Sequence, residues 1–123
     1  MSEFRSDTSM ITLTTDFGTT DWFVAVMKGV ITAFNPKAHF TDISHNISPG
    51  NIREAAFVLK QALPWFPEKT IHLAVVDPGV GTSRRSLIIE TDSQYLVGPD
   101  NGIFSSALLD LQIVRTIRID ATT

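Results

Sequence analysis

The hydrophobic pattern of this chain alternates between short apolar runs and longer stretches with helical spacing. The run at residues 71–76 is nearly continuous, which is typical of a strand covered on both faces in a parallel or mixed sheet. Two further runs, 86–90 and 95–98, are separated by a short polar segment and predict a hairpin. The remaining predicted strands are short as well and span residues 10–15, 39–44 and 113–119.

The longer stretches predict helices. In residues 22–34 the large apolar side chains, Trp22 and Phe23 among them, share one helix face, which we interpret as a face buried in the core. A second helix is predicted over residues 52–63, and a short one within residues 99–109. The element order βαβαβ, a hairpin and then αβ predicts a three-layer α/β/α sandwich with a mostly parallel sheet.

Length and charge limit the class of protein. A chain of 123 residues with 43% hydrophobic content corresponds to one globular domain. We assign that domain to residues 10–123, because residues 1–9 lack periodicity and are interpreted as a disordered leader. The net charge of -3, without a long basic cluster, argues against a nucleic-acid partner. The expected partner is a small molecule or another protein.

The chain contains no cysteine, which excludes disulfides and thiolate metal sites. It also lacks an apolar run of about 18 residues and the pattern of a signal peptide. We therefore expect a protein of the cytoplasm that does not contact a membrane.

Three predicted strands end in turns that carry both glycine and an acid: Asp16-Phe17-Gly18, Asp77-Pro78-Gly79 and Pro99-Asp100-Asn101-Gly102. If these strands are neighbours, their carboxyl ends meet at one edge, where open α/β sheets bind ligands. Asp16 is suited to accept hydrogen bonds from the vicinal hydroxyls of a ribose. Asp77 is either a working carboxylate or the acceptor of a local turn, and spacing alone leaves both open.

Other candidates have a structural interpretation beside the functional one. Asp21 precedes the first predicted helix and is interpreted mainly as its cap. His45, at another strand end, has the chemistry of a general base or a metal ligand. Because no second histidine stands at ligand spacing, we interpret it as structural. The loop Gly79-Val80-Gly81 lacks the lysine of a P-loop and supports phosphate binding only weakly.

Five motifs, taken in order, resemble those of one family. They are Thr15-Asp16-Phe17-Gly18 with Asp21, Lys28-Gly29, Asp42-Ile43-Ser44-His45, Val76-Asp77-Pro78-Gly79-Val80-Gly81-Thr82 with Arg84-Arg85, and Pro99-Asp100-Asn101-Gly102. The family is that of the S-adenosyl-L-methionine (SAM) hydroxide adenosyltransferases, relatives of the SAM-dependent chlorinase and fluorinase. The resemblance runs from about residue 10 to residue 109.

The resemblance implies hydrolysis of SAM to adenosine and L-methionine by attack of water or hydroxide at the ribose C5′. It assigns the ribose diol to Asp16, and it makes Asp77 and Arg84 two members of a water-activating Asp-Arg-His set. Aromatic residues replace Asp77 and Gly50 in the halogenating relatives, which indicates the hydrolytic branch. SAM is then a substrate, without a metal or redox cofactor. The substrate-binding residues implied are Asp16, Phe17, Asp21, Pro78, Gly79 and Asn101.

The resemblance also implies parts that this chain lacks. The catalytic histidine of the family follows the last predicted strand, and none of His39, His45 and His72 matches its position. The C-terminal β-rich domain is absent too, so we interpret the chain as a truncated N-terminal SAM-binding domain of a protein that forms a homotrimer at full length. Whether this chain is active on its own stays open.

Two alternative functions remain beside SAM hydrolysis. One is a non-catalytic module that binds adenosine or SAM. The other is a metal-dependent hydrolase that uses Asp16, Asp77 and Asp100 as hard oxygen ligands.

Overall fold

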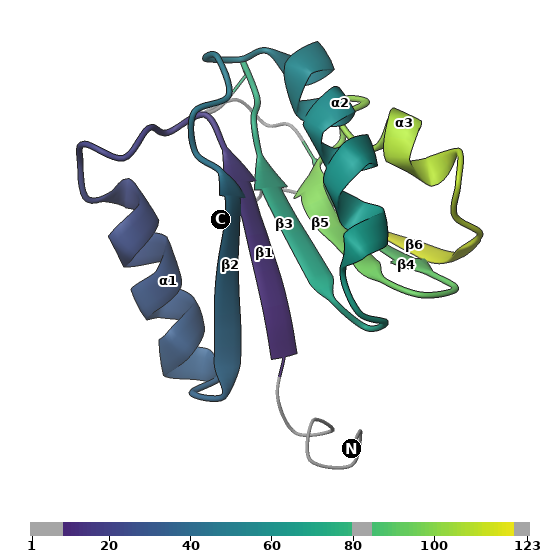
Figure 1. The fold of residues 1–123 in the computed structure, drawn as a ribbon, viewed down its shortest axis with the longest axis horizontal. Helices are drawn as coiled ribbons and strands as arrows, with labels where there is room; N and C mark the ends of the chain where they lie inside the picture. Colours follow the sequence, from purple (N-terminus) through teal and green to yellow (C-terminus); the bar gives the residue numbers. More distant parts are fainter. Residues whose placement is uncertain (1–8, 80–84, 120–123) are drawn as a thin grey trace.

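The computed structural model describes residues 9–79 and 85–119 of the chain. The expected leader lies outside this part except for Ser9, which already belongs to the first strand. The elements in chain order (Figure 1) are β1 (Ser9–Thr15), α1 (Phe23–Phe34), β2 (Ala38–Ser44), α2 (Ile52–Ala62), the 3-10 helix η2 (Leu63–Trp65), β3 (Ile71–Val75), β4 (Ser86–Thr91), β5 (Tyr95–Pro99), α3 (Ser105–Leu108) and β6 (Ile113–Ile119).

The strands form one sheet in the order β2-β1-β3-β5-β4-β6. Strands β2, β1, β3 and β5 pair in parallel, whereas β4 pairs antiparallel with both β5 and β6. The prediction of a mostly parallel sheet with a hairpin is therefore confirmed. The carboxyl ends of β1, β2, β3 and β5 share one edge, because these four strands run in the same direction.

The helices lie on both faces of this sheet. The crossover through α1 leads from β1 to β2, and the crossover through α2 leads back past β1 to β3, so two right-handed connections place these helices on opposite faces. Contacts support this placement for α1: Lys28 Nζ lies 3.0 Å from Asp42 Oδ2 and 6.0 Å from the centre of the Phe40 ring, both on β2. Figure 1 shows α2 and α3 together on the other side. The three-layer prediction is confirmed.

The main core lies between the sheet and helices α2 and α3. Its fully buried side chains include Leu59 from α2, Ala74 from β3 and Leu96 from β5. Gly98 permits close packing there, because a Cβ on this residue would lie 2.7 Å from the carbonyl oxygen of Ala74 and 2.9 Å from Cζ of Phe104. This edge of the core supports the loops that follow β3 and β5.

Two burial predictions are wrong. Helix α1 has no buried residue, and Trp22 and Phe23 before and at its start are 69% and 53% exposed. Strand β3 is fully buried on one face only, because Leu73 and Val75 on the other face are half-buried. Helical or strand periodicity identifies an apolar face, but whether other elements cover that face depends on the fold. Helix α1 lies near the β2 edge of the sheet.

No helix in the described part of the chain is long and apolar enough to cross a membrane.

Candidate active site

The loops that follow β1, β2 and β3 meet at the carboxyl edge of the sheet. The backbone N–H of Gly50, in the loop after β2, donates to Oδ2 of Asp16 over 2.7 Å. Gly50 also lies against Pro78, since a Cβ on this glycine would come within 3.1 Å of Cβ of Pro78. The structure therefore brings the turn of Asp16 and the turn of Asp77-Pro78-Gly79 to one place.

The backbone of Gly50 makes this meeting possible. Its φ of +69° is a conformation that residues with a side chain rarely adopt, so glycine allows the N–H to point at Asp16 while the chain passes Pro78. A hydrogen bond from an amide to a carboxylate is shorter and stronger than one between neutral groups. Asp16 is half-buried and held in orientation by this contact.

Asp77 follows β3 after the fully buried Val76, and its Oδ1 accepts a hydrogen bond of 2.8 Å from the N–H of Gly79. This contact closes the local turn that one of the two sequence interpretations requires. Asn101 reaches the same strand end, because its Nδ2 donates to the carbonyl oxygen of Val76 over 3.0 Å. Arg84, the predicted partner of Asp77, lies outside the described residues, so their pairing stays a prediction.

The other predicted residues near Asp16 are engaged locally. The N–H of Phe17 donates to Oγ1 of Thr15 over 3.2 Å, and its ring centre lies 5.8 Å from that of Phe23. Asp21 is exposed, and its Oδ1 accepts a hydrogen bond of 3.0 Å from the N–H of Phe23 at the start of α1. The contact forms a local turn before the helix, whose N-cap position is Trp22 and has no side-chain cap hydrogen bond.

The three carboxylates of the metal alternative have different partners. Asp16 binds the amide of Gly50, Asp77 binds the amide of Gly79, and the exposed Asp100 lies 3.7 Å from Nε of Arg118. No group of three His, Asp or Glu side chains within residues 9–79 and 85–119 is arranged to hold a metal ion. The geometry gives the metal alternative no support.

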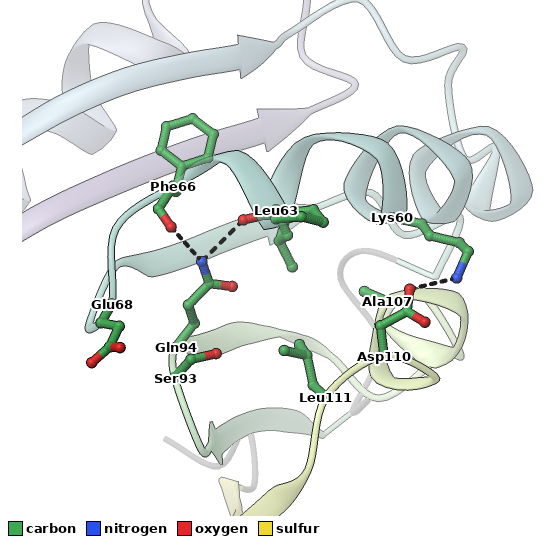
Figure 2. Close-up of a pocket in the computed structure, with 10 residues that line it drawn as sticks. Lys60, Leu63, Phe66, Glu68, Ser93, Gln94, Ala107, Asp110 and Leu111 are labelled. Atoms are coloured by element: carbon green, nitrogen blue, oxygen red, sulfur yellow. Dashed lines mark hydrogen bonds and ion pairs between the residues drawn. The ribbon is translucent and has the colours of Figure 1, made fainter.

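A pocket of about 240 Å³ lies elsewhere, between α2, α3 and the hairpin (Figure 2). Its polar groups bind one another: Nε2 of Gln94 donates to the carbonyl oxygens of Leu63 and Phe66 over 3.0 and 3.2 Å, and Nζ of Lys60 pairs with Asp110 at 2.8 Å. Gln94 immediately precedes β5, so this pocket is at the amino-terminal edge of that strand. It is separate from the edge that carries Asp16 and Asp77.

Two histidines are buried, and both contact threonines of β1. His45 Nδ1 lies 2.8 Å from Oγ1 of Thr15, and His72 Nδ1 lies 2.6 Å from Oγ1 of Thr12. Burial lowers the pKa of His72 to about 4, and interaction with Gln94 offsets only part of that effect. The structural interpretation of His45 agrees with its burial and its contact.

Sequence reasoning missed two contributors to this edge. It named Gly50 only as a position that differs from relatives, and it did not assign Thr15 a role. The N–H of Gly50 and the carboxylate of Asp16 are separated by 34 positions, and the side chains of Thr15 and His45 by 30. Nothing in the local sequence reports such contacts, although the unusual density of threonine in the buried strand β1 is a signal for polar partners inside the core.

The fold and this edge define a class of protein: a mixed α/β domain whose ligand edge presents an oriented carboxylate beside two glycine turns. Residues 11–123 match the family model described as the SAM hydroxide adenosyltransferase N-terminal domain. The chain belongs to this family, and the resemblance stated from its motifs is confirmed.

Two relatives of the chain are named as SAM hydrolases. The chain is 50% identical over 116 residues to an "(R)-S-adenosyl-L-methionine hydrolase" of Methanocaldococcus jannaschii, a match that covers 90% of this chain and 44% of the relative. A protein of the same name from Salinispora tropica is 45% identical over 108 residues, covering 88% and 41%. The chain thus spans about two fifths of the length of these relatives.

A solved structure agrees with the fold. It is that of an uncharacterized conserved protein from Thermotoga maritima, with a TM-score of 0.85 and 40% sequence identity. The match covers 89% of this chain and 43% of the other.

Proposed function

We propose that this chain is the substrate-binding N-terminal domain of an enzyme that hydrolyses SAM to adenosine and L-methionine. Membership of the family supports the proposal, and so do the names of the relatives. The observation that carries it is the contact of Asp16 with Gly50 and of Gly50 with Pro78, which joins the two turns expected to hold ribose and water.

In this proposal Asp16 accepts hydrogen bonds from the 2′- and 3′-hydroxyls of the ribose. An ionised carboxylate only accepts hydrogen bonds, which suits two vicinal hydroxyl donors. The Gly50 N–H holds this carboxylate in orientation. The remaining substrate contacts fall to neighbours on the same edge, namely Phe17, Asp21, Pro78, Gly79 and Asn101.

The proposed reaction is a displacement at C5′ of the ribose. The oxygen of water forms a bond to C5′ while the C5′–S bond breaks. The electron pair of the C5′–S bond goes to sulfur, which changes from a sulfonium to the neutral thioether of methionine. One proton of the water is released. The leaving group needs no proton, so the catalytic demand falls on orienting the nucleophile.

Asp77 is the residue proposed to orient that water, because its carboxylate stands at the strand end beside the Asp16 turn. By resemblance, Arg84 pairs with this carboxylate and holds it in place. SAM serves as substrate, and the proposal includes neither a metal nor another cofactor. It also retains a cytoplasmic location, from composition, and a homotrimer at full length, from the resemblance.

The test combines adenosine binding with turnover. Calorimetric titration with adenosine measures the affinity, and chromatography of a reaction with SAM measures adenosine and methionine. We expect Asp16→Ala to weaken adenosine binding by about 10- to 100-fold, the value of hydrogen bonds to a charged group. Asp110→Ala is the matched control, because it removes an exposed carboxylate beside the separate pocket.

The outcomes separate the candidate functions. Hydrolysis that Asp77→Asn abolishes without loss of adenosine binding supports the proposal, since the amide oxygen preserves the turn with Gly79 and only the charge is lost. Adenosine binding without turnover in a full-length version identifies a binding module, whereas in this chain alone it agrees with a substrate-binding N-terminal domain. Inhibition by a chelator identifies a metal-dependent hydrolase, and the absence of both binding and turnover refutes the proposal for this chain.

A further inference from the structure

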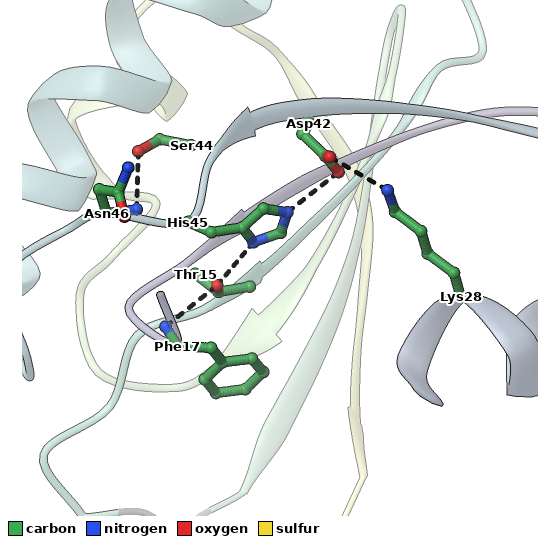
Figure 3. Close-up of polar contacts among 7 residues, drawn as sticks. All are labelled: Thr15, Phe17, Lys28, Asp42, Ser44, His45 and Asn46. Atoms are coloured by element: carbon green, nitrogen blue, oxygen red, sulfur yellow. Dashed lines mark hydrogen bonds and ion pairs between the residues drawn. The ribbon is translucent and has the colours of Figure 1, made fainter. Parts of the chain in front are cut away.

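A continuous line of polar contacts leads from the surface to the turn that carries Asp16 (Figure 3). Nζ of Lys28 lies 3.0 Å from Oδ2 of Asp42, and Oδ1 of Asp42 lies 3.0 Å from Nε2 of His45. Nδ1 of His45 lies 2.8 Å from Oγ1 of Thr15, which also accepts the N–H of Phe17 over 3.2 Å. The line therefore ends on the backbone immediately after Asp16.

The inner part of this line is buried and its outer part is not. Thr15 is fully buried and His45 is 4% exposed, whereas Asp42 and Lys28 lie at the surface. A buried imidazole needs partners for both nitrogens, because an unpaired polar group in the core is costly. Thr15 and Asp42 are on opposite sides of the ring: Thr15 pairs with Nδ1, and the carboxylate of Asp42 lies 3.0 Å from Nε2.

The hydrogen positions follow from what each group is able to donate. Asp42 offers only acceptor oxygens to Nε2 of His45, and the Thr15 hydroxyl is able to donate to Nδ1 while it accepts the Phe17 N–H. Nε2 then carries the imidazole hydrogen and faces the carboxylate of Asp42, a close approach that is not a well-aligned hydrogen bond. Burial alone raises the pKa of Asp42, but His45 and Lys28 together outweigh it and keep that pKa below its usual value.

His45 also holds the other side of the turn. Its backbone carbonyl accepts the N–H of Gly18 over 2.7 Å, and the N–H of Ile47 approaches the carbonyl oxygen of Thr15 at 3.4 Å. The residues on both sides of Asp16 and Phe17 are therefore fastened to the segment around His45. The side-chain contact to Thr15 is the part of this attachment that depends on the identity of the residue.

We propose that His45 is a positioning residue that holds the Asp16 turn through the hydroxyl of Thr15. This inference rests on the proposed function only in assigning ribose binding to Asp16. A carboxylate that binds two hydroxyls at once has to be held in one orientation, and the cost of a loosened site appears as lost affinity. His45 contacts neither substrate nor water in this role.

The experiment compares adenosine affinity with the hydrogen exchange of single backbone amides, measured by NMR on the whole chain. In His45→Leu and in Thr15→Val, we expect the Phe17 amide to exchange about tenfold faster and adenosine to bind about tenfold more weakly. Thr15→Val is the milder change and keeps the test possible if the first variant does not fold. In His45→Asn, whose side-chain oxygen can take the place of Nδ1, affinity should stay within about threefold of the wild type.

His72→Leu is the matched control, because His72 is equally buried and also contacts a threonine of β1. It should lower stability while the Phe17 amide and adenosine affinity change by less than about twofold. Wild-type exchange and affinity in both His45→Leu and Thr15→Val would overturn the positioning role. If the amide responds as expected but the wild type binds no adenosine, the proposed function fails and the positioning role stands.

Discussion

Substitution of Gly50 by alanine tests the contact that joins the two turns of the site. The φ of +69° costs a residue with a side chain about 1–2 kcal/mol. The added Cβ would also lie 3.1 Å from Cβ of Pro78, and relief of this contact adds about 1 kcal/mol. We therefore expect the free energy of unfolding to fall by about 2–3 kcal/mol in Gly50→Ala.

The same change should weaken adenosine binding, because relief of the contact with Pro78 moves the N–H that now lies 2.7 Å from Oδ2 of Asp16. A partial loss of this charged hydrogen bond, about 1 kcal/mol, corresponds to a roughly fivefold lower affinity. Urea unfolding measures the stability, and calorimetric titration with adenosine measures the affinity.

Gly102→Ala is the control for backbone strain. Gly102 has a φ of +87°, but the nearest atom to an added Cβ is Oγ of Ser105 at 3.7 Å, an ordinary contact. Its loss of stability should be about 1–2 kcal/mol, from strain alone. Equal losses in Gly50→Ala and Gly102→Ala, together with unchanged adenosine affinity in Gly50→Ala, would refute the reasoning.

Three further predictions concern stability, measured by urea unfolding. Gly98→Ala should lower the free energy of unfolding by about 1–3 kcal/mol, because its Cβ would lie 2.7 Å from the carbonyl oxygen of Ala74. Gly29→Ala, in an open helical position, should raise it by about 0.5–1 kcal/mol. Equal effects of the two changes would contradict the close packing at Gly98. The pKa of about 4 at His72 lies below the pKa of histidine in the unfolded chain, so the unfolded chain binds the proton more tightly. The free energy of unfolding should therefore be highest above about pH 6.5 and fall by up to about 3 kcal/mol toward pH 4. If His72→Gln shows the same dependence on pH as the wild type, His72 is not its cause. Asn51→Ala should cost about 1 kcal/mol, because its Oδ1 caps helix α2 over 3.0 Å, and Asn51→Asp should retain the cap.

Most secondary structure was predictable because its signals are local. The last strand was predicted at residues 113–119 and is β6 (Ile113–Ile119), and the hairpin of β4 and β5 lies where two apolar runs flank a polar segment. The burial of α1 was not predictable in the same way. An apolar helix face appears in the sequence whether or not the rest of the chain covers it, and Phe34 at the end of this face is 88% exposed.

The candidate site was likewise predictable only in its local parts. Asp16, Asp77 and Asn101 were singled out because they follow predicted strands in glycine turns. Their assembly was an expectation that depended on strand order, which local periodicity does not report. The parallel order of β1, β3 and β5 brings the three loop ends together.

The sequence by itself determined the element order, the glycine turns at the strand ends and the family motifs, because each is written in consecutive residues. Only the tertiary structure decided that the Gly50 amide orients Asp16 and that the His45 ring holds Thr15. These contacts join residues 34 and 30 positions apart, and they form because the parallel strands β1 and β2 end side by side. Strand pairing sets these distances, and it is a property of the whole sheet.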